Sequence, residues 1–154
     1  MDNAEIKRIY ELYFDTVYRI SFLYMKNEHD ALDVTEDTFF SMIRRSPSFE
    51  NDEKAKAWLI VTASNKCRTL LKKWWNKRND YTEAMKDVTA EDNKNSVLSE
   101  VMNLDDKYRI PTYLYYYEGY KTSEIGEMLG EKPSTIQTRL AKARKLLKLE
   151  LEEK

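Results

Sequence analysis

The side chains best suited to bind another molecule lie between Thr122 and Leu147, where basic and hydrogen-bonding residues follow a tight turn. Thr122 or Ser123 can cap a first short helix, and Gly130 can end it in a left-handed conformation. Pro133 fits the first turn of a second helix, because the N–H that proline lacks has no intrahelical partner there. Two short helices joined in this way, the second of them basic, predict a helix-turn-helix that enters the major groove of DNA.

The second helix of this motif has one apolar face and one polar face. Ile136, Leu140, Ala143 and Leu147 recur at steps of three and four residues, so they should face the interior. The remaining side chains are hydroxyl, amide and cationic groups, which bind phosphates and base edges. They are Ser134, Thr135, Gln137, Thr138, Arg139, Lys142, Arg144 and Lys145. The alternative is an amphipathic helical hairpin whose basic face is only solvated.

A second set of candidate nucleic-acid ligands lies on a helix expected at about residues 54–75. Ile60, Ala63 and Cys67 mark its buried side. The opposite side combines an aromatic ring, small hydrogen-bonding residues and cations, which together can stack unpaired bases beside a phosphate track. These residues are Trp58, Thr62, Asn65, Lys66, Arg68, Thr69, Lys72 and Lys73. The alternative for the tryptophan is a place in the core between helices.

Three carboxylates and one aromatic ring share a face of the preceding helix, expected at about residues 30–45. They are Asp33, Glu36, Asp37 and Phe40. Carboxylates at this spacing can hold a metal in a helical bundle, but such sites also use histidine, and the only histidine precedes the helix. We therefore expect no metal. An exposed phenylalanine among charges suits a protein-docking face, for which a solvated helix face is the alternative.

The composition argues against several classes of function. The single Cys67 rules out an internal disulfide and a cysteine-based zinc site, and a single histidine argues against a serine-type catalytic triad. No glycine-rich loop that could cradle phosphates is present. We expect no catalytic residues, no cofactor and no small-molecule substrate. The expected location is the cytoplasm, because no apolar run has the length of a membrane span and the N-terminus has no apolar signal core.

The distribution of charge is more informative than the net charge of −1. Residues 66–79 hold six basic residues and no acid, and residues 131–148 hold six basic residues and one acid. The remainder of the chain is strongly acidic. Two basic patches on an acidic body predict weak DNA binding by the protein alone, and a partner that holds both patches on the duplex.

Few glycines and prolines, with a charged-residue content of 34%, favour an all-α protein. Residues 76–95 have scattered apolar positions and high polarity, which is typical of a flexible linker. We therefore expect two small helical domains, residues 1–75 and residues 96–154. Pro111 falls inside an expected helix of the second domain, which either starts there or is kinked. The aromatic run Tyr113, Leu114, Tyr116 and Tyr117 is expected in the core of that domain.

Taken in their order along the chain, several sequence motifs resemble those of bacterial RNA polymerase sigma factors of the sigma-70 family, in particular the extracytoplasmic-function (ECF) group. DALDVTEDTF at residues 30–39 resembles the region 2 signature D-A-x-D-x-x-Q-E-x-F, with Glu-Asp in place of Gln-Glu. AWL at residues 57–59, followed by an asparagine and LLKK, resembles the A-W-L…N…L-L-R-R pattern. LDDKYR at residues 104–109, EIG at residues 124–126 and TIQTRL at residues 135–140 resemble L-P-E-K-Y-R, E-I-A and T-V-K-S-R-L of region 4. The resemblance covers nearly the whole chain.

The resemblance implies that the acidic face with Phe40 docks on the coiled coil of the β′ subunit of core RNA polymerase. The helix that carries Trp58 and the loop before it, residues 46–53, would open the promoter −10 element and hold an extruded base. The helix-turn-helix domain would bind the −35 element of promoter DNA and contact the β flap. Such proteins are usually held inactive by an anti-sigma factor, which is often membrane-bound.

The function expected from the whole sequence is promoter-specific initiation of transcription. Two alternatives remain open, a stand-alone helix-turn-helix regulator and a helical protein-interaction adaptor. Gln137 and Thr138 replace a Lys-Ser pair that is frequent in the family. The DNA sequence that this helix reads therefore cannot be carried over from relatives.

Overall fold

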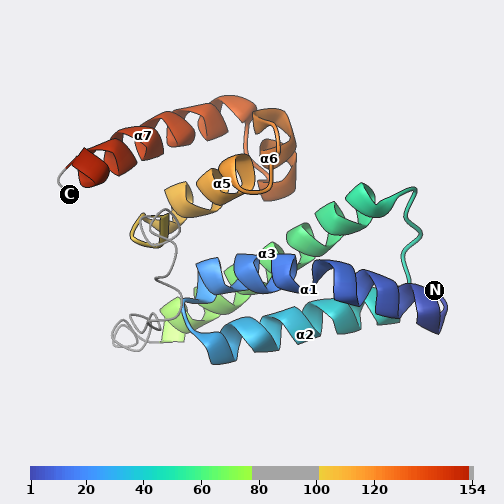
Figure 1. Cartoon of the computed structure of the whole chain (residues 1–154). Coiled ribbons are helices and arrows are strands. Elements are labelled where there is room, and N and C mark those ends of the chain that lie inside the picture. The colour runs from blue at the N-terminus through green and yellow to red at the C-terminus, as the bar shows by residue number, and fades with distance from the viewer. Residues whose placement is uncertain (78–100, 153–154) are drawn as a thin grey trace. The chain divides into compact units, whose positions relative to one another are not determined.

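The computed structural model describes residues 1–77 and 101–152, and every regular element in these ranges is an α-helix (Figure 1). The chain divides into two compact units, Met1–Asp87 and Val88–Lys154. The prediction of an all-α fold is confirmed. Positions 78–95 of the predicted linker lie outside the described residues, and its first two positions belong to the third helix. No helix in the described ranges has the length and apolar composition of a membrane span.

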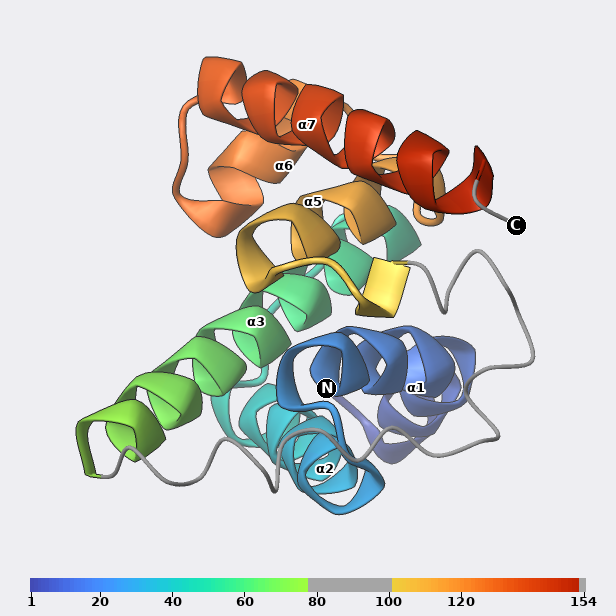
Figure 2. The ribbon, with the colours of Figure 1, turned by 90° about the vertical axis from the view of Figure 1, so that its left-hand side faces the viewer.

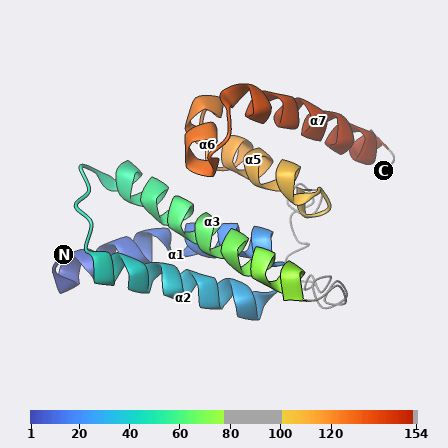
Figure 3. The same ribbon diagram turned by 180° about the vertical axis from the view of Figure 1, so that it is seen from behind.

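The first unit contains α1 (Asn3–Met25), α2 (Glu28–Arg45) and α3 (Asp52–Lys77), and each helix packs on the other two (Figures 1 and 3). Its buried side chains include Ile9, Val17, Ile20, Val34, Met42, Leu59, Ile60 and Ala63. Cys67 lies in the same core, as predicted. Burial raises the pKa of its thiol to about 12, so the group is neutral at physiological pH and unreactive.

The segment between α2 and α3, here called the α2–α3 loop, comprises residues 46–51. It is two residues shorter than predicted, because α3 already begins at Asp52. Ser46 leaves α2 with a left-handed φ of 46°, and Pro47 follows. At the other end, Oδ1 of Asn51 accepts a hydrogen bond from the N–H of Lys54 at 2.9 Å and so caps α3.

The second unit contains α5 (Asp106–Tyr116), α6 (Thr122–Leu129) and α7 (Pro133–Glu152), and α7 packs on both of the others (Figure 2). Its buried side chains include Ile110, Leu114, Ile125, Ile136, Leu140 and Ala143. The helix α5 starts before Pro111, which excludes the first of the two predicted alternatives, a helix that begins at this proline. The helix continues past Pro111 although proline cannot donate a hydrogen bond to the preceding turn.

The helix-turn-helix is confirmed, and two glycines shape its turn. Gly130 ends α6 with a φ of 71°, as predicted. At Gly126 a Cβ atom would lie only 2.6 Å from the carbonyl oxygen of Glu131, so the turn can pass this close only over a glycine. The predicted cap at Thr122 or Ser123 is wrong. The N-cap residue is Lys121, whose N–H donates to Oε1 of Glu124 at 2.8 Å.

The turn before α5 is organised by Arg109, a fully buried arginine. Its Nη1 donates hydrogen bonds to the carbonyl oxygens of Met102, at 3.2 Å, and Leu104, at 3.0 Å. Its Nη2 makes an ion pair with Asp106 in the first turn of α5. The guanidinium therefore satisfies backbone acceptors that would otherwise be buried without a partner.

The prediction of a core position for all four residues of the aromatic run is only half right. Tyr113 and Leu114 are buried, but Tyr116 and Tyr117 are 50% and 39% exposed. The ring of Tyr117 stacks on that of Tyr113 at a centroid distance of 5.3 Å, at the edge of the core. The hydroxyl of Tyr116 accepts a hydrogen bond from Nη1 of Arg144 at 3.3 Å. This bond ties α5 to the basic side of α7.

Candidate nucleic-acid interface

Six of the eight residues predicted to bind DNA on α7 are exposed. They are Ser134, Gln137, Thr138, Lys142, Arg144 and Lys145. Thr135 and Arg139 are half-buried. The apolar side is as predicted, because Ile136, Leu140 and Ala143 are buried and Leu147 is half-buried. The structure thus presents the predicted hydroxyl, amide and cationic groups along the outer side of the helix-turn-helix.

Intramolecular partners hold several of these side chains. Nη1 of Arg139 lies 3.6 Å from Oε1 of Glu131 in the turn between α6 and α7. Arg144 is bound by the Tyr116 hydroxyl described above. The hydroxyl of Thr138 donates to the carbonyl oxygen of Ser134 at 3.0 Å, so its oxygen remains an acceptor toward solvent. These contacts restrict the two arginines before any ligand arrives, which lowers the entropy lost on binding.

Trp58 on α3 is neither fully in the core nor free in solvent. It is half-buried, and its ring meets the ring of Phe49 in the α2–α3 loop edge to face, with centroids 6.0 Å apart and planes at 66°. Of the other predicted ligands on this helix, Asn65, Thr69, Lys72 and Lys73 are exposed, while Thr62, Lys66 and Arg68 are half-buried. The loop and α3 therefore form one aromatic and polar surface.

Two polar contacts organise the middle of this surface. Nη2 of Arg68 donates to Oδ1 of Asn65 at 2.5 Å, one turn earlier on α3. Nζ of Lys66 lies 2.9 Å from Oδ2 of Asp37 on α2. The second contact was not predicted, since Lys66 and Asp37 belong to different predicted sites. It places the edge of the acidic face directly beside the basic face.

The acidic face of α2 is exposed as predicted. Asp33, Glu36, Asp37 and Phe40 all face solvent, and Phe40 is 61% exposed. Leu32 and Ile43, which the sequence analysis did not include, are 42% and 46% exposed on the same helix. The exposure of Leu32 and Ile43 could have been predicted from the sequence, because both lie, like Phe40, at helical positions outside the buried side of α2. The acidic face thus includes Phe40 and is bordered by two further exposed apolar side chains.

One group with the composition of a metal site occurs among the described residues, and it borders this face. Nδ1 of His29 lies 3.5 Å from Oδ1 of Asp30 and 3.6 Å from Oδ2 of Asp33. The histidine and Asp33 are largely exposed. These separations are those of surface ion pairs, which need no metal.

One unit therefore combines an acidic and aromatic face with an adjacent basic helix, and the other is a helix-turn-helix with a basic second helix. This combination fits a DNA-binding protein that also docks on a protein partner. Comparison with known proteins identifies the class further. Residues 9–77 match the family "Sigma-70 region 2", and residues 94–147 match the family "Sigma-70, region 4".

Relatives match over most of the chain. RNA polymerase sigma factor SigV of Bacillus subtilis (strain 168) is 30% identical over 138 residues, which cover 87% of this chain and 83% of the relative. ECF RNA polymerase sigma factor SigW of the same organism is 26% identical over 172 residues, which cover 97% and 90%. The chain belongs to the sigma-70 family and, within it, to the ECF group of sigma factors.

Solved structures confirm the fold. The sigma factor RpoE, in complex with the anti-sigma factor NepR from Bartonella quintana, matches with a TM-score of 0.75 at 17% identity, covering 96% of this chain and 97% of that one. CnrH, in complex with the cytosolic domain of CnrY, matches with a TM-score of 0.69 at 21% identity, covering 99% and 90%. The two family matches and the relatives, in contrast, show a promoter-directing sigma factor and not a stand-alone regulator or an adaptor.

Proposed function

We propose that the protein works through three surfaces, one for polymerase and two for promoter DNA. The acidic face of α2, with Asp33, Glu36, Asp37 and Phe40, docks on the coiled coil of the β′ subunit of core RNA polymerase. The observation that carries this assignment is the exposure of Phe40 among carboxylates, with Leu32 and Ile43 exposed on the same helix. Exposed apolar side chains beside charged ones suit a protein interface.

The second surface combines the α2–α3 loop with the outward side of α3, and it holds the non-template strand of the −10 element. Extruding a base costs a few kcal/mol. Stacking on Trp58, worth about 1–3 kcal/mol per base, offsets much of this cost. The half-buried position of Trp58 against Phe49 supports this role, because a ring fixed along one side loses little freedom when a base stacks on it. The cations Lys66, Arg68, Lys72 and Lys73 would bind the phosphates of this strand. The hydroxyl and amide groups of Thr62, Asn65 and Thr69 would bind its bases.

The third surface is the outer side of α7, which enters the major groove at the −35 element. Arg139, Lys142 and Arg144 contact phosphates and set the register of the helix. Gln137 and Thr138 read base edges, because a glutamine amide can bond both edge atoms of an adenine. The remaining contacts come from Ser134, Thr135 and Lys145. In this proposal residues 1–75 form region 2, residues 76–95 form the linker, and residues 96–154 form region 4, which also contacts the β flap.

Regulation by an anti-sigma factor is part of the proposal. One of the solved structures named above is a sigma factor in complex with an anti-sigma factor, and the other is CnrH in complex with the cytosolic domain of CnrY. We propose that this protein is inhibited in the same way, in the cytoplasm, and that it is held at the membrane when the inhibitor is anchored there. The proposed activity uses no catalytic residue and no cofactor of its own.

The direct test is transcription reconstituted from purified components. Core polymerase with this protein is expected to start from a small set of genomic promoters that share a −35 and a −10 element, as shown by sequencing the transcripts. The protein alone is expected to bind the same promoters only weakly in a gel-shift at about 0.15 M salt. Identical start sites with and without the protein, beside an active control sigma factor, would refute the proposal.

Charge reversal on α2 tests the polymerase surface. Asp33→Arg is expected to lower the affinity for core polymerase by about tenfold or more, because it places a like charge opposite a partner surface selected for an acid. Asp33 is the better choice than Asp37, whose reversal would also repel Lys66. Asp15→Arg on α1, another exposed acid outside this face, is the matched control. Fluorescence titration with labelled core polymerase measures both, and equal affinities would remove Asp33 from the interface.

Base reading by α7 is tested at Gln137. Gln137→Ala is expected to weaken the preference at one base pair of the −35 element by about 1–3 kcal/mol, with other positions unchanged. Lys142→Ala should instead weaken binding to all −35 sequences alike, because a phosphate contact carries no sequence information. Transcription from a library of −35 variants distinguishes the two patterns. An unaltered preference in Gln137→Ala would exclude this residue as a reader.

A further inference from the structure

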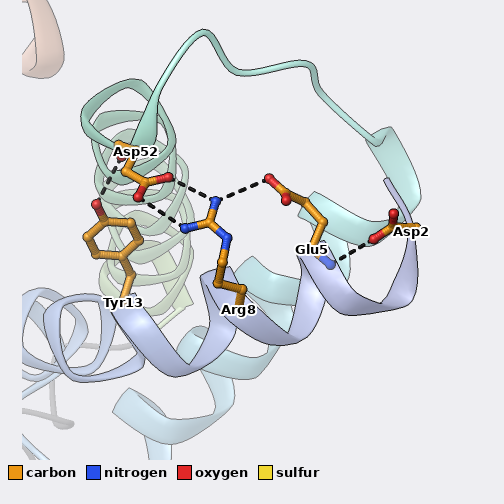
Figure 4. Close-up of polar contacts among 5 residues, drawn as sticks. All are labelled: Asp2, Glu5, Arg8, Tyr13 and Asp52. Atoms are coloured by element: carbon orange, nitrogen blue, oxygen red, sulfur yellow. Dashed lines mark hydrogen bonds and ion pairs between the residues drawn. The ribbon is translucent and has the colours of Figure 1, made fainter.

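Two side chains in the first half of α1, Arg8 and Tyr13, bind Asp52, the first residue of α3 (Figure 4). Nη1 of Arg8 donates to Oδ2 of Asp52 at 3.0 Å, and Nη2 donates to Oδ1 at 2.9 Å. The hydroxyl of Tyr13 donates to the backbone carbonyl oxygen of Asp52 at 3.0 Å. Nη2 of Arg8 also donates to Oε1 of Glu5 at 3.3 Å, which steadies the guanidinium from its own helix. Both the side chain and the backbone of Asp52 are therefore bound to α1.

This ion pair suits a positional role better than a stabilising one. The side chains of Arg8 and Asp52 are each 48% exposed, and pairs exposed to this extent add little to folding stability. The paired bonds of a planar guanidinium fix the orientation of the carboxylate as well as its distance. The hydrogen bond from Arg8 also lowers the pKa of the Asp52 carboxyl, so the acid stays charged at physiological pH.

Asp52 directly follows the α2–α3 loop, and the loop is restricted at its other end. Ser46 sits in the left-handed region, and Pro47 after it has a fixed φ. A loop of residues 46–51 held at both ends has little freedom to move independently of α3. Its central aromatic residue, Phe49, meets Trp58 edge to face. A displacement of Asp52 would therefore shift the Phe49–Trp58 ring pair.

We propose that Arg8 is a positioning residue for promoter opening: by fixing Asp52, it holds the α2–α3 loop and the Phe49–Trp58 ring pair in the arrangement that captures an extruded −10 base. The inference rests on the role proposed above for this loop. Arg8 needs no contact with DNA for this purpose. It also offsets the charge of Asp52, one of three acids at residues 50–53 that would otherwise repel the phosphates of an approaching strand.

The test measures base selection by the complete protein bound to core polymerase. Single-stranded non-template oligonucleotides carry each alternative base in turn at every −10 position, and the ratio of affinities gives the preference. The variants are Arg8→Ala, Arg8→Lys and the exchanged pair Arg8→Asp with Asp52→Arg. The matched control is Lys7→Ala, which removes an exposed ion pair within α1, with Glu11 at 4.0 Å. Trp58→Ala reports whether the loop captures a base at all.

Arg8→Ala is expected to lower the preference at the captured position about threefold, with the affinity for core polymerase and the thermal unfolding unchanged. Arg8→Lys should lose part of the preference because it keeps the charge but not the paired bonds, and the exchanged pair should restore most of it. Lys7→Ala should match the wild type. A preference reduced by Trp58→Ala but not by Arg8→Ala would overturn the positioning role and leave base capture intact. A preference unchanged in both would overturn base capture by this loop, and the role of Arg8 with it.

Discussion

Arg109→Met is expected to unfold the second unit while the first unit stays folded. The substitution keeps most of the buried volume but removes the donors for the carbonyl oxygens of Met102 and Leu104 and the partner of Asp106. Each buried acceptor left without a donor costs about 1–3 kcal/mol, so the total loss should be about 3–5 kcal/mol. A helical unit of this size has a stability of the same order.

The chain offers a way to observe the two units separately. All three tryptophans, Trp58, Trp74 and Trp75, lie in the first unit. Tryptophan fluorescence should therefore show an unchanged unfolding transition in Arg109→Met, while circular dichroism shows lost helix at temperatures where the wild type is folded. Lys107→Met, at an exposed neighbouring position of α5, is the control and should behave like the wild type. A circular dichroism transition within about one degree of the wild type would show that Arg109 is not the determinant of this turn.

Phe40→Ala is expected to give the largest loss of polymerase binding from any single truncation on α2. Exposed aromatic residues at the centre of an interface commonly contribute 2 kcal/mol or more when they become buried, which corresponds to a loss of roughly 30-fold in affinity. The side chain is 61% exposed in the free protein, so its removal should leave folding stability nearly unchanged. Phe40→Ala should therefore weaken polymerase binding without lowering the free energy of unfolding.

The comparison requires a control that removes a similar amount of exposed apolar surface. Leu12→Ala is suitable, because Leu12 is 50% exposed on α1 and lies outside the acidic face. Titration of each variant against labelled core polymerase gives the affinities, and urea unfolding gives the stabilities. If Phe40→Ala and Leu12→Ala bind core polymerase equally well, the docking surface does not include Phe40.

The helices and the turn of the helix-turn-helix could be predicted because their signals are local. Residues three and four apart on one helix share a face, so Ile136, Leu140 and Ala143 were placed correctly without tertiary information. Gly130 and Pro133 act on the backbone at their own positions, and both have the predicted roles. The same reasoning failed for Tyr116 and Tyr117, because a helix cannot turn every residue of a continuous aromatic run toward one core.

Other features depend on contacts that no local pattern encodes. Arg109 bonds to backbone carbonyls in a turn whose path is unknown from the sequence, and a charged residue is rarely expected in a core. Arg8 and Asp52 are 44 positions apart and meet only when α1 and α3 pack together. The candidate residues for DNA and polymerase binding were chosen by type and spacing, but their contacts with one another, such as Lys66 with Asp37, required coordinates.

The close approach at Gly126 has a consequence for engineering this family. An alanine in place of Gly126 would put its Cβ atom 2.6 Å from the carbonyl oxygen of Glu131. A chain with alanine at this position would therefore need a turn with a slightly different path, which would change the direction in which the second helix leaves it. Side chains grafted onto α7 from such a chain would then have a shifted orientation. The side chains of α7 should therefore be exchanged only together with the residue at position 126.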